Sequence, residues 1–181
     1  MNKIAVVAIL LLSLVAVGEE KFKILKKGGD KIIVDKTTKL MWTTDIEGKV
    51  DLLGAIDKCS TLTYGGFTDW RIPKLNELRT IVEGCQKIEP NGACQIVPFT
   101  SEMLSRGQCS CWEEKGETYK KCFWNEKYFG KFCEPVVAIG TADACQGACY
   151  FVIDFSTSGL GTSHYSNKYK LFCVRSGTDE K

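Results

Sequence analysis

The chain has 181 residues, with 10 cysteines and a single histidine, and its 24 basic and 22 acidic residues give a net charge of +2. This length fits one domain. The near balance of charge leaves no basic field for nucleic acid, which disfavours a nucleic-acid-binding protein. One histidine also disfavours a histidine-rich metal centre or Ser-His-Asp catalysis, unless His164 carries the chemistry alone.

Residues 1–18 have the pattern of a secretory signal peptide. Lys3 precedes an apolar run at residues 4–17, and the small residues Ala16 and Gly18 fit a signal peptidase site. The run is 14 residues long, short for a membrane span. We therefore expect an exported protein, periplasmic, cell-surface or secreted, with no membrane span after cleavage. The alternative is an uncleaved membrane anchor.

After an exposed lead-in at residues 19–30, the sequence predicts a β-hairpin that joins 31–35 to 40–43. Asp51 stands at the N-cap of a helix of about three turns, whose expected apolar stripe is Leu52, Leu53, Ala55, Ile56, Cys59 and Leu62. A second helix follows Pro73 and ends at Gly84; its expected buried stripe is Leu75, Leu78, Ile81 and Val82.

All ten cysteines lie in the exported part, where an oxidising compartment and an even count predict up to five disulfides. Eight of them fall within residues 84–149, which we expect to form long loops held by disulfides rather than by core burial. These eight are Cys85, Cys94, Cys109, Cys111, Cys122, Cys133, Cys145 and Cys149. A local bridge from Cys85 to Cys94 would close the turn-rich segment 89–92. Zinc is disfavoured because no Cys-x-x-Cys motif exists.

A strand is predicted at 150–155, a Gly/Ser/Thr loop at 156–163, a last strand at 170–175 and a frayed tail at 178–181. The order of elements predicts an α+β fold. Both ends of the chain are predicted to be strands, and pairing within one sheet would bring the termini together.

Three stretches together resemble a known family. They are Asp35-x-x-Thr38-x-Leu40-Met41-Trp42, Gly65-Gly66-Phe67-Thr68-Asp69-Trp70-Arg71-Ile72-Pro73-x-x-x-Glu77-Leu78, and Phe172-Cys173-Val174-Arg175. They resemble the Lcl C-terminal domain of bacterial collagen-like adhesins, over residues 31–177. The resemblance implies a C-type-lectin-like fold, with two helices on a small twisted antiparallel sheet and long disulfide-held loops. This fold is distantly related to formylglycine-generating enzymes. The resemblance also implies an extracellular or envelope setting, and adhesion that includes binding of sulfated glycosaminoglycans.

The resemblance assigns structural roles to the motif residues, which are Asp35, Trp42, Gly65, Asp69, Trp70, Arg71, Pro73, Glu77 and Arg175. Cys59 and Cys173 fit the core disulfide of the family. The two tryptophans are expected in the core, and Asp69 and Arg71 are expected to pair or to tie loop backbone. Lys74 stands where the family usually has a helix-capping threonine, so the cap must come from elsewhere.

A glycan-binding surface needs basic groups or aromatic rings, and two segments offer them: residues 115–131 and the loop 156–168. The candidate residues are Lys120, Lys121, Lys127, Tyr128, His164, Tyr165 and Asn167. Acidic residues are interspersed in the first segment, and the alternative there is an ordinary solvated loop.

Two triplets could hold calcium, since Glu89 and Asn91 or Asn125 and Glu126 supply oxygen ligands. Their spacing differs from that of sugar-binding lectins, and turn chemistry is the preferred interpretation. We expect no metal, no cofactor and no catalytic residue. The hypothesis is a binding or adhesion module for a glycan or matrix polymer, in which a homo-oligomer is possible. The alternatives are a subunit of an envelope or filament assembly, and an oxidase of the formylglycine-generating type.

Overall fold

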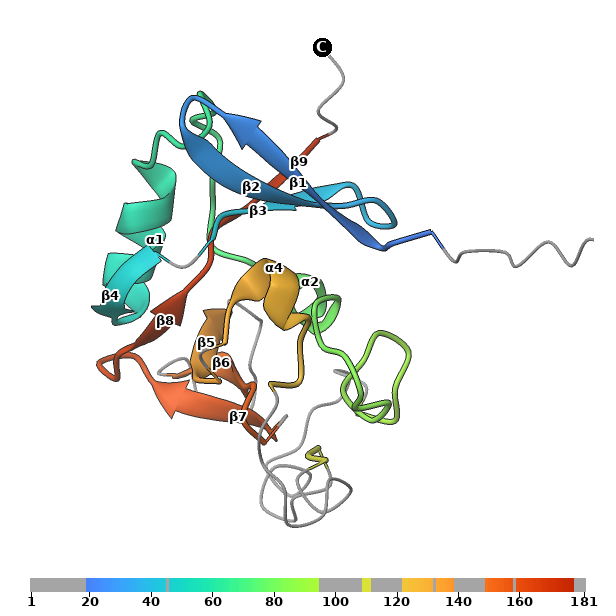
Figure 1. Ribbon diagram of the computed structural model, residues 1–181. Helices are drawn as coiled ribbons and strands as arrows, with labels where there is room; N and C mark the ends of the chain where they lie inside the picture. Colours follow the sequence, from blue (N-terminus) through green and yellow to red (C-terminus); the bar gives the residue numbers. More distant parts are fainter. Residues whose placement is uncertain are drawn as a thin grey trace, which may run out of the picture.

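The computed structural model describes residues 19–44, 46–94, 109–111, 122–131, 133–138, 149–157 and 159–177. The expected signal peptide, the tail, Cys145, Lys120 and Lys121 lie outside these residues. The described chain forms two β-sheets with short helices beside them (Figure 1). No helix among the described residues has the length and apolar character needed to cross a membrane.

The first sheet has the strand order β1-β2-β3-β9 and unites both ends of the domain. Its strands are β1 (Phe22–Lys27), β2 (Asp30–Asp35), β3 (Leu40–Trp42) and β9 (Val174–Ser176). The hairpin of β2 and β3 confirms the prediction, and so does the pairing of β9 with β3, which joins the two chain ends.

Residues 19–30 are not merely an exposed lead-in, because half of them belong to β1. Phe22 is buried and its ring lies against Tyr128, with ring centroids 5.4 Å apart. Gly28 and Gly29 have φ of 61° and 89°, the two positive values that a tight two-residue hairpin turn requires. The Gly-Gly pair between two apolar runs was a sequence signal for this hairpin.

The second sheet has the order β4-β8-β5-β6-β7. Its strands are β4 (Ile46–Val50), β5 (Pro135–Ala138), β6 (Cys149–Asp154), β7 (Gly159–His164) and β8 (Tyr169–Leu171). The predicted loop 156–163 is wrong, since β7 occupies most of it and pairs with β6. The predicted strand 170–175 is split: β8 ends at Leu171, and after two residues β9 begins in the other sheet.

The helices are α1 (Leu52–Ser60), α2 (Leu75–Arg79) and α4 (Glu126–Phe129). The predicted cap of α1 is confirmed, because Asp51 Oδ1 accepts the Gly54 N–H at 2.8 Å. The second helix is shorter than predicted. The fold is thus mostly β, with two open sheets and few short helices, rather than two helices on one small antiparallel sheet. One strand pair, β5 with β8, is parallel.

The strand β2 of the first sheet is buried on both faces. Successive residues of β2 point to opposite sides, so Ile33 joins one apolar cluster and Ile32 and Val34 the other. Trp42 lies in the first cluster and Trp70 in the second, at 0% and 2% exposure. Both tryptophans are core aromatics, as predicted.

The cysteine-rich segment contributes to the core, contrary to the prediction of loops without core burial. The five cysteines from Cys85 to Cys122 that the structure describes are all buried, and four aromatic side chains beside them are too: Phe123, Trp124, Tyr128 and Phe129. The local Cys85–Cys94 bridge is wrong. The pairs are instead Cys85–Cys111, Cys94–Cys109 and Cys122–Cys133.

Candidate functional site

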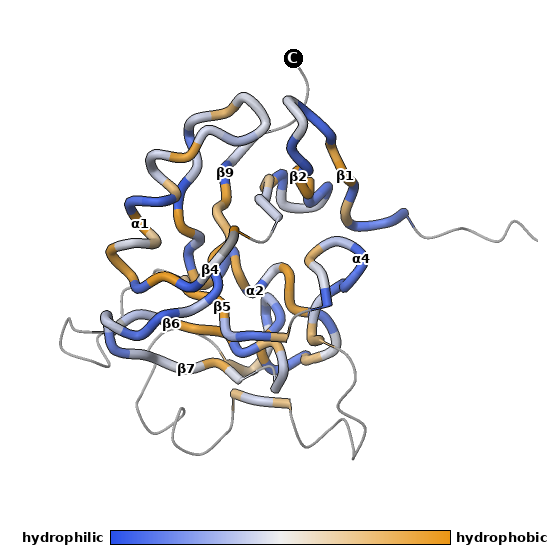
Figure 2. The backbone as a smooth tube through the Cα atoms, turned by 60° about the vertical axis from the view of Figure 1, so that its left-hand side comes forward, coloured by the Kyte–Doolittle hydropathy of each residue, from blue (hydrophilic) through white to orange (hydrophobic). Residues whose placement is uncertain are grey.

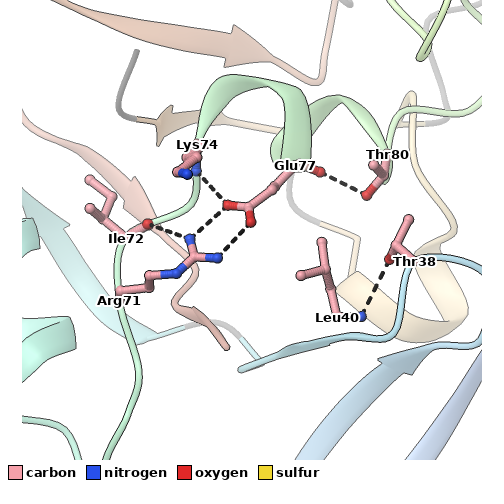
Figure 3. Close-up of polar contacts among 7 residues, drawn as sticks. All are labelled: Thr38, Leu40, Arg71, Ile72, Lys74, Glu77 and Thr80. Atoms are coloured by element: carbon pink, nitrogen blue, oxygen red, sulfur yellow. Dashed lines mark hydrogen bonds and ion pairs between the residues drawn. The ribbon is translucent and has the colours of Figure 1, made fainter. Parts of the chain in front are cut away.

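The charged motif residues form two ion pairs that cross between elements. Asp69 accepts from Arg175 of β9, at 2.7 Å from Nε and 3.1 Å from Nη2. Arg71 binds Glu77 of α2 through both terminal nitrogens, at 2.7 and 2.6 Å (Figure 3). The expected pairing of Asp69 with Arg71 is therefore wrong, but Arg71 does tie loop backbone, since its Nη1 donates to the Ile72 carbonyl at 3.4 Å. Asp69 and Arg71 thus attach the connector between the helices, residues 67–73, to β9 and to α2. The Arg175 hydrogen bond lowers the pKa of Asp69.

Lys74 makes no side-chain cap, and Glu77 makes the reciprocal bond of a capping box at the start of α2. A lysine side chain has no acceptor, but the Lys74 backbone N–H donates to Glu77 Oε2 at 2.8 Å. Burial raises the pKa of Glu77, but the bonds from Arg71 and from the Lys74 backbone outweigh burial and lower it overall. The hydrogen bonds between Arg71 and Glu77 raise the pKa of Arg71. One carboxylate thus joins α2 to the connector.

Residues 65–70 of the motif attach the chain between α1 and α2 to the β1–β2 hairpin. Gly65 N donates to Asp30 Oδ2 at 2.7 Å, and Trp70 Nε1 donates to the Tyr64 carbonyl at 3.1 Å. The ring of Phe67 has a cation near it from each edge strand of the first sheet, Lys27 Nζ at 4.0 Å from the ring centroid and Arg175 Cζ at 3.9 Å. These contacts attach the motif to the first sheet.

Asp35 and the core disulfide complete this scaffold. Asp35 is buried, and its Oδ1 accepts the backbone N–H groups of Thr37 and Thr38 at 2.8 and 3.1 Å, which shapes the β2–β3 turn. The predicted Cys59–Cys173 disulfide is present, with a Cα–Cα distance of 5.6 Å. All eight cysteines whose side chains the structure describes are paired.

The connection from β7 to β8 is the exposed part of the predicted site. His164, Tyr165 and Asn167 are exposed there, and the rings of His164 and Tyr165 lie 4.2 Å apart. Ser166 N donates to His164 Nδ1 at 3.4 Å, and the Ser166 hydroxyl lies 2.8 Å from the same atom. Three of the predicted ligand-binding residues are therefore brought together at one surface loop.

Hydrogen bonds hold this loop at both ends. The Tyr165 carbonyl accepts from Leu52 N of α1 at 3.3 Å, and the Asn167 carbonyl accepts from the buried Tyr150 hydroxyl. Burial, with Tyr169 and Asp51 nearby, raises the pKa of Tyr150 to about 12, so this hydroxyl stays a donor at neutral pH.

The Asn167 side chain is itself part of the framework. Its Nδ2 donates to Ser163 Oγ at 2.8 Å, and that oxygen lies 2.7 Å from the Tyr169 hydroxyl. Asn167 therefore positions the loop, while the ring of Tyr165, half exposed, is open to a ligand.

The profile of the Lcl C-terminal domain family matches residues 31–175 of the chain. The chain belongs to the Lcl C-terminal domain family. No curated protein and no solved structure was found to match it significantly. The C-type-lectin-like arrangement therefore stays a prediction. The four disulfides indicate that this Lcl C-terminal domain resides in an oxidising, extracytoplasmic environment.

Two residues of α1 that the sequence placed in the core lie instead at the surface of this Lcl C-terminal domain. Leu53 is 70% exposed and Ile56 is 41% exposed, while Ala55 and Cys59 of the same helix are fully buried. At 3.6 residues per turn, Leu53 lies about 120° to 160° around the helix from the two buried residues. That angle is a signal in the sequence that Leu53 lies off the buried face. Leu53 follows the residue that binds the Tyr165 carbonyl, so α1 and the exposed loop adjoin.

The lysine-rich segment does not supply the expected surface where the structure describes it. Tyr128 is 3% exposed and its hydroxyl donates to the Phe22 carbonyl at 2.8 Å, so it is a core residue. Lys127 is exposed, but its ammonium group lies 2.5 Å from Glu20 Oε1. That contact lowers the pKa of Glu20 and raises that of Lys127.

The triplets weighed as calcium ligands are used for turns and caps. Glu89 accepts from Gly84 N at 2.9 Å, Asn125 caps α4, and Glu126 accepts from Cys122 N at 3.1 Å. Asn91 has a φ of 70°, as a turn residue does. Among the described residues, no group of three His, Cys, Asp or Glu side chains could hold a metal ion.

A pocket of about 290 Å³ lies beside the second triplet and is lined by Glu83, Cys122, Trp124, Asn125, Glu126 and Lys127. Burial raises the pKa of Glu83, against the opposing effects of Lys21 and Asn125. Since the lining carries both charge signs, the pocket indicates no ligand class.

Proposed function

We propose that this Lcl C-terminal domain is an adhesive binding module that contacts a glycan or matrix polymer through residues 164–168 and carries out no catalysis. The observation that carries the proposal is the exposed ring of Tyr165 on a loop that the fold holds in place. Aromatic rings with polar neighbours suit a ligand whose faces are apolar and whose rim is hydroxylated, as a sugar's are.

The hydrogen bonds of the loop favour this role. Because Ser166 N donates to His164 Nδ1, the neutral imidazole carries its proton on Nε2, which supplies a donor beside the Tyr165 ring. The contacts from Leu52 and Tyr150 fix the loop before a ligand arrives, which reduces the entropy lost on binding.

An assembly subunit is the second candidate, because large exposed apolar side chains lie on α1 and on this adjoining loop. They are Leu53, Ile56 and Tyr165, at 70%, 41% and 50% exposure. Exposed apolar side chains on adjoining elements also suit a protein partner. Size-exclusion chromatography of the exported domain, residues 19–181, separates the two candidates, since a subunit elutes as an oligomer that Leu53→Ser disrupts.

The experiment for glycan binding is a glycan array together with a heparin column, at low salt. Tyr165→Ala is expected to weaken binding at least tenfold, as loss of a central aromatic contact does. Ile24→Ala removes an exposed apolar side chain from the other sheet and serves as the matched control. Retention of no glycan, or equal affinity of Tyr165→Ala and wild type, contradicts the proposal.

A further inference from the structure

The positive charge of the exported domain is concentrated in its first hairpin. Residues 21–39 hold seven lysines and two aspartates, a net charge of +5, and one of these lysines, Lys36, is paired with Glu19 at 3.0 Å. The other residues of 19–181 hold 16 basic and 20 acidic side chains, a net charge of −4. A molecule with this asymmetry is oriented by an anionic surface, because the hairpin is attracted and the rest is repelled.

The two acids of the hairpin are directed at backbone groups. Asp30 accepts from Gly65 N at 2.7 Å, and Asp35 accepts from the backbone of its own turn. The lysines on β1 are Lys23, Lys26 and Lys27, and all three side chains are exposed. Their charges therefore contribute to the field outside the molecule.

The position of β1 places these side chains along the open edge of the first sheet. β1 is an outer strand of its sheet, as Figure 1 shows. Side chains alternate along it, so Lys23 and Lys27 flank the edge on one face, and Lys26 flanks it on the other. Ile24 lies among them at 40% exposure, and the tube of β1 alternates between hydrophilic and hydrophobic colours (Figure 2).

We propose that the β1–β2 hairpin docks this edge on an anionic lipid surface, with the lysines at the headgroups and Ile24 in the interface. Lysines near an anionic bilayer each add to affinity, and a partly exposed isoleucine adds apolar burial that lipid provides. This surface lies on the first sheet, whereas Tyr165 follows a strand of the second, so the inference goes beyond the proposed function.

Two other occupants fit the edge less well. An added β-strand needs the outward backbone groups of β1, but the Phe22 carbonyl already accepts from the Tyr128 hydroxyl. Lysines on an edge strand also oppose strand addition. A sulfated polymer uses the lysines equally well, but it gives no reason for an exposed Ile24 among them.

The test is sedimentation of the oxidised domain, residues 19–181, with vesicles of phosphatidylcholine, with and without phosphatidylglycerol. Binding is expected only with phosphatidylglycerol and should weaken as salt rises. The variant K23Q/K26Q/K27Q is expected to lose affinity on the order of 100-fold. The control K49Q/K74Q/K131Q removes the same charge at exposed lysines elsewhere and should bind vesicles within about twofold of wild type.

Ile24→Ser separates lipid from polymer. It is expected to weaken vesicle binding roughly threefold to tenfold and to leave the retention on heparin unchanged. Absence of vesicle binding at low salt, an equal loss in both triple variants, or an Ile24→Ser variant that binds vesicles like wild type would each overturn the proposal. Tyr165→Ala should leave vesicle binding unchanged. A failure of the glycan proposal therefore leaves the vesicle result unaffected, and the two proposals are tested separately.

Discussion

The Cys59–Cys173 disulfide offers the sharpest test of what stabilises the fold. The double substitution Cys59→Ala/Cys173→Ala opens a loop closed across 114 residues. The chain-entropy model gives about 4.8 kcal/mol for that closure. Cys122→Ala/Cys133→Ala opens a loop of 11 residues, for which the same model gives about 2.8 kcal/mol. The first variant should therefore lose about 2 kcal/mol more than the second.

Burial is a rival explanation, because Cys59 and Cys173 are also the more deeply buried pair. The bridge between Cys94 and Cys109 separates the two causes: both cysteines are 2% exposed, yet the separation is only 15 residues. Its loop entropy is about 3.0 kcal/mol. If loop length decides, its removal should resemble removal of the Cys122–Cys133 bridge.

The assay is equilibrium urea unfolding of the oxidised variants, followed by circular dichroism and extrapolated linearly to water. Equal losses for the pairs with separations of 114 and 15 would refute the loop-entropy reasoning. That result would show that packing around the buried sulfur atoms, rather than restriction of the unfolded chain, sets the contribution.

Three further predictions concern the motif. In a double-mutant cycle, Arg71→Met and Glu77→Gln should couple by about 1 kcal/mol, since the Arg71 side chain is 38% exposed; additive losses would show that the pair does not interact. Because the pKa of Glu77 lies below its ordinary value of 4.5, its stabilisation is present above that pH and is lost as the pH falls through the lowered value. Thermal midpoints should thus fall less steeply with acid in Glu77→Gln than in wild type, and parallel curves would argue against it. Gly65→Ala should cost about 2–4 kcal/mol in urea unfolding, and Gly66→Ala only about 1 kcal/mol. Both positions have positive φ, but a Cβ at Gly65 would lie 2.3 Å from Ile32 Cδ1, whereas at Gly66 nothing lies within 4 Å; equal costs would contradict the packing argument.

Short-range patterns in the sequence predicted the elements that depend on neighbouring residues. The β2–β3 hairpin, the Asp51 cap of α1 and the burial of Trp42 follow from alternation, capping chemistry and a large apolar side chain. The motif resemblance supplied the family and the Cys59–Cys173 disulfide. Even β1 was within reach, since Gly28-Gly29 between two apolar runs is a hairpin signal.

The tertiary structure decided what depends on distance through space. Asp69 and Arg71 are two residues apart, yet their partners lie in β9 and in α2. The residues around Tyr128 in the sequence have the composition of a surface loop. Its ring nevertheless packs on Phe22, which lies near the other end of the chain. The pairing of Cys85 with Cys111 likewise depends on which loops the core brings together.

The sequence by itself determined an exported-type, disulfide-rich Lcl C-terminal domain with a local hairpin, a capped helix and a tryptophan core. Those features arise from interactions within a few residues, or from a motif whose residue order is specific to the family. The two-sheet architecture, the pairing of the other three described disulfides, the exposure of Leu53 and the exposed lysines along the outer strand β1 came only from the tertiary structure. They depend on contacts between segments distant in sequence, which neither periodicity nor composition specifies.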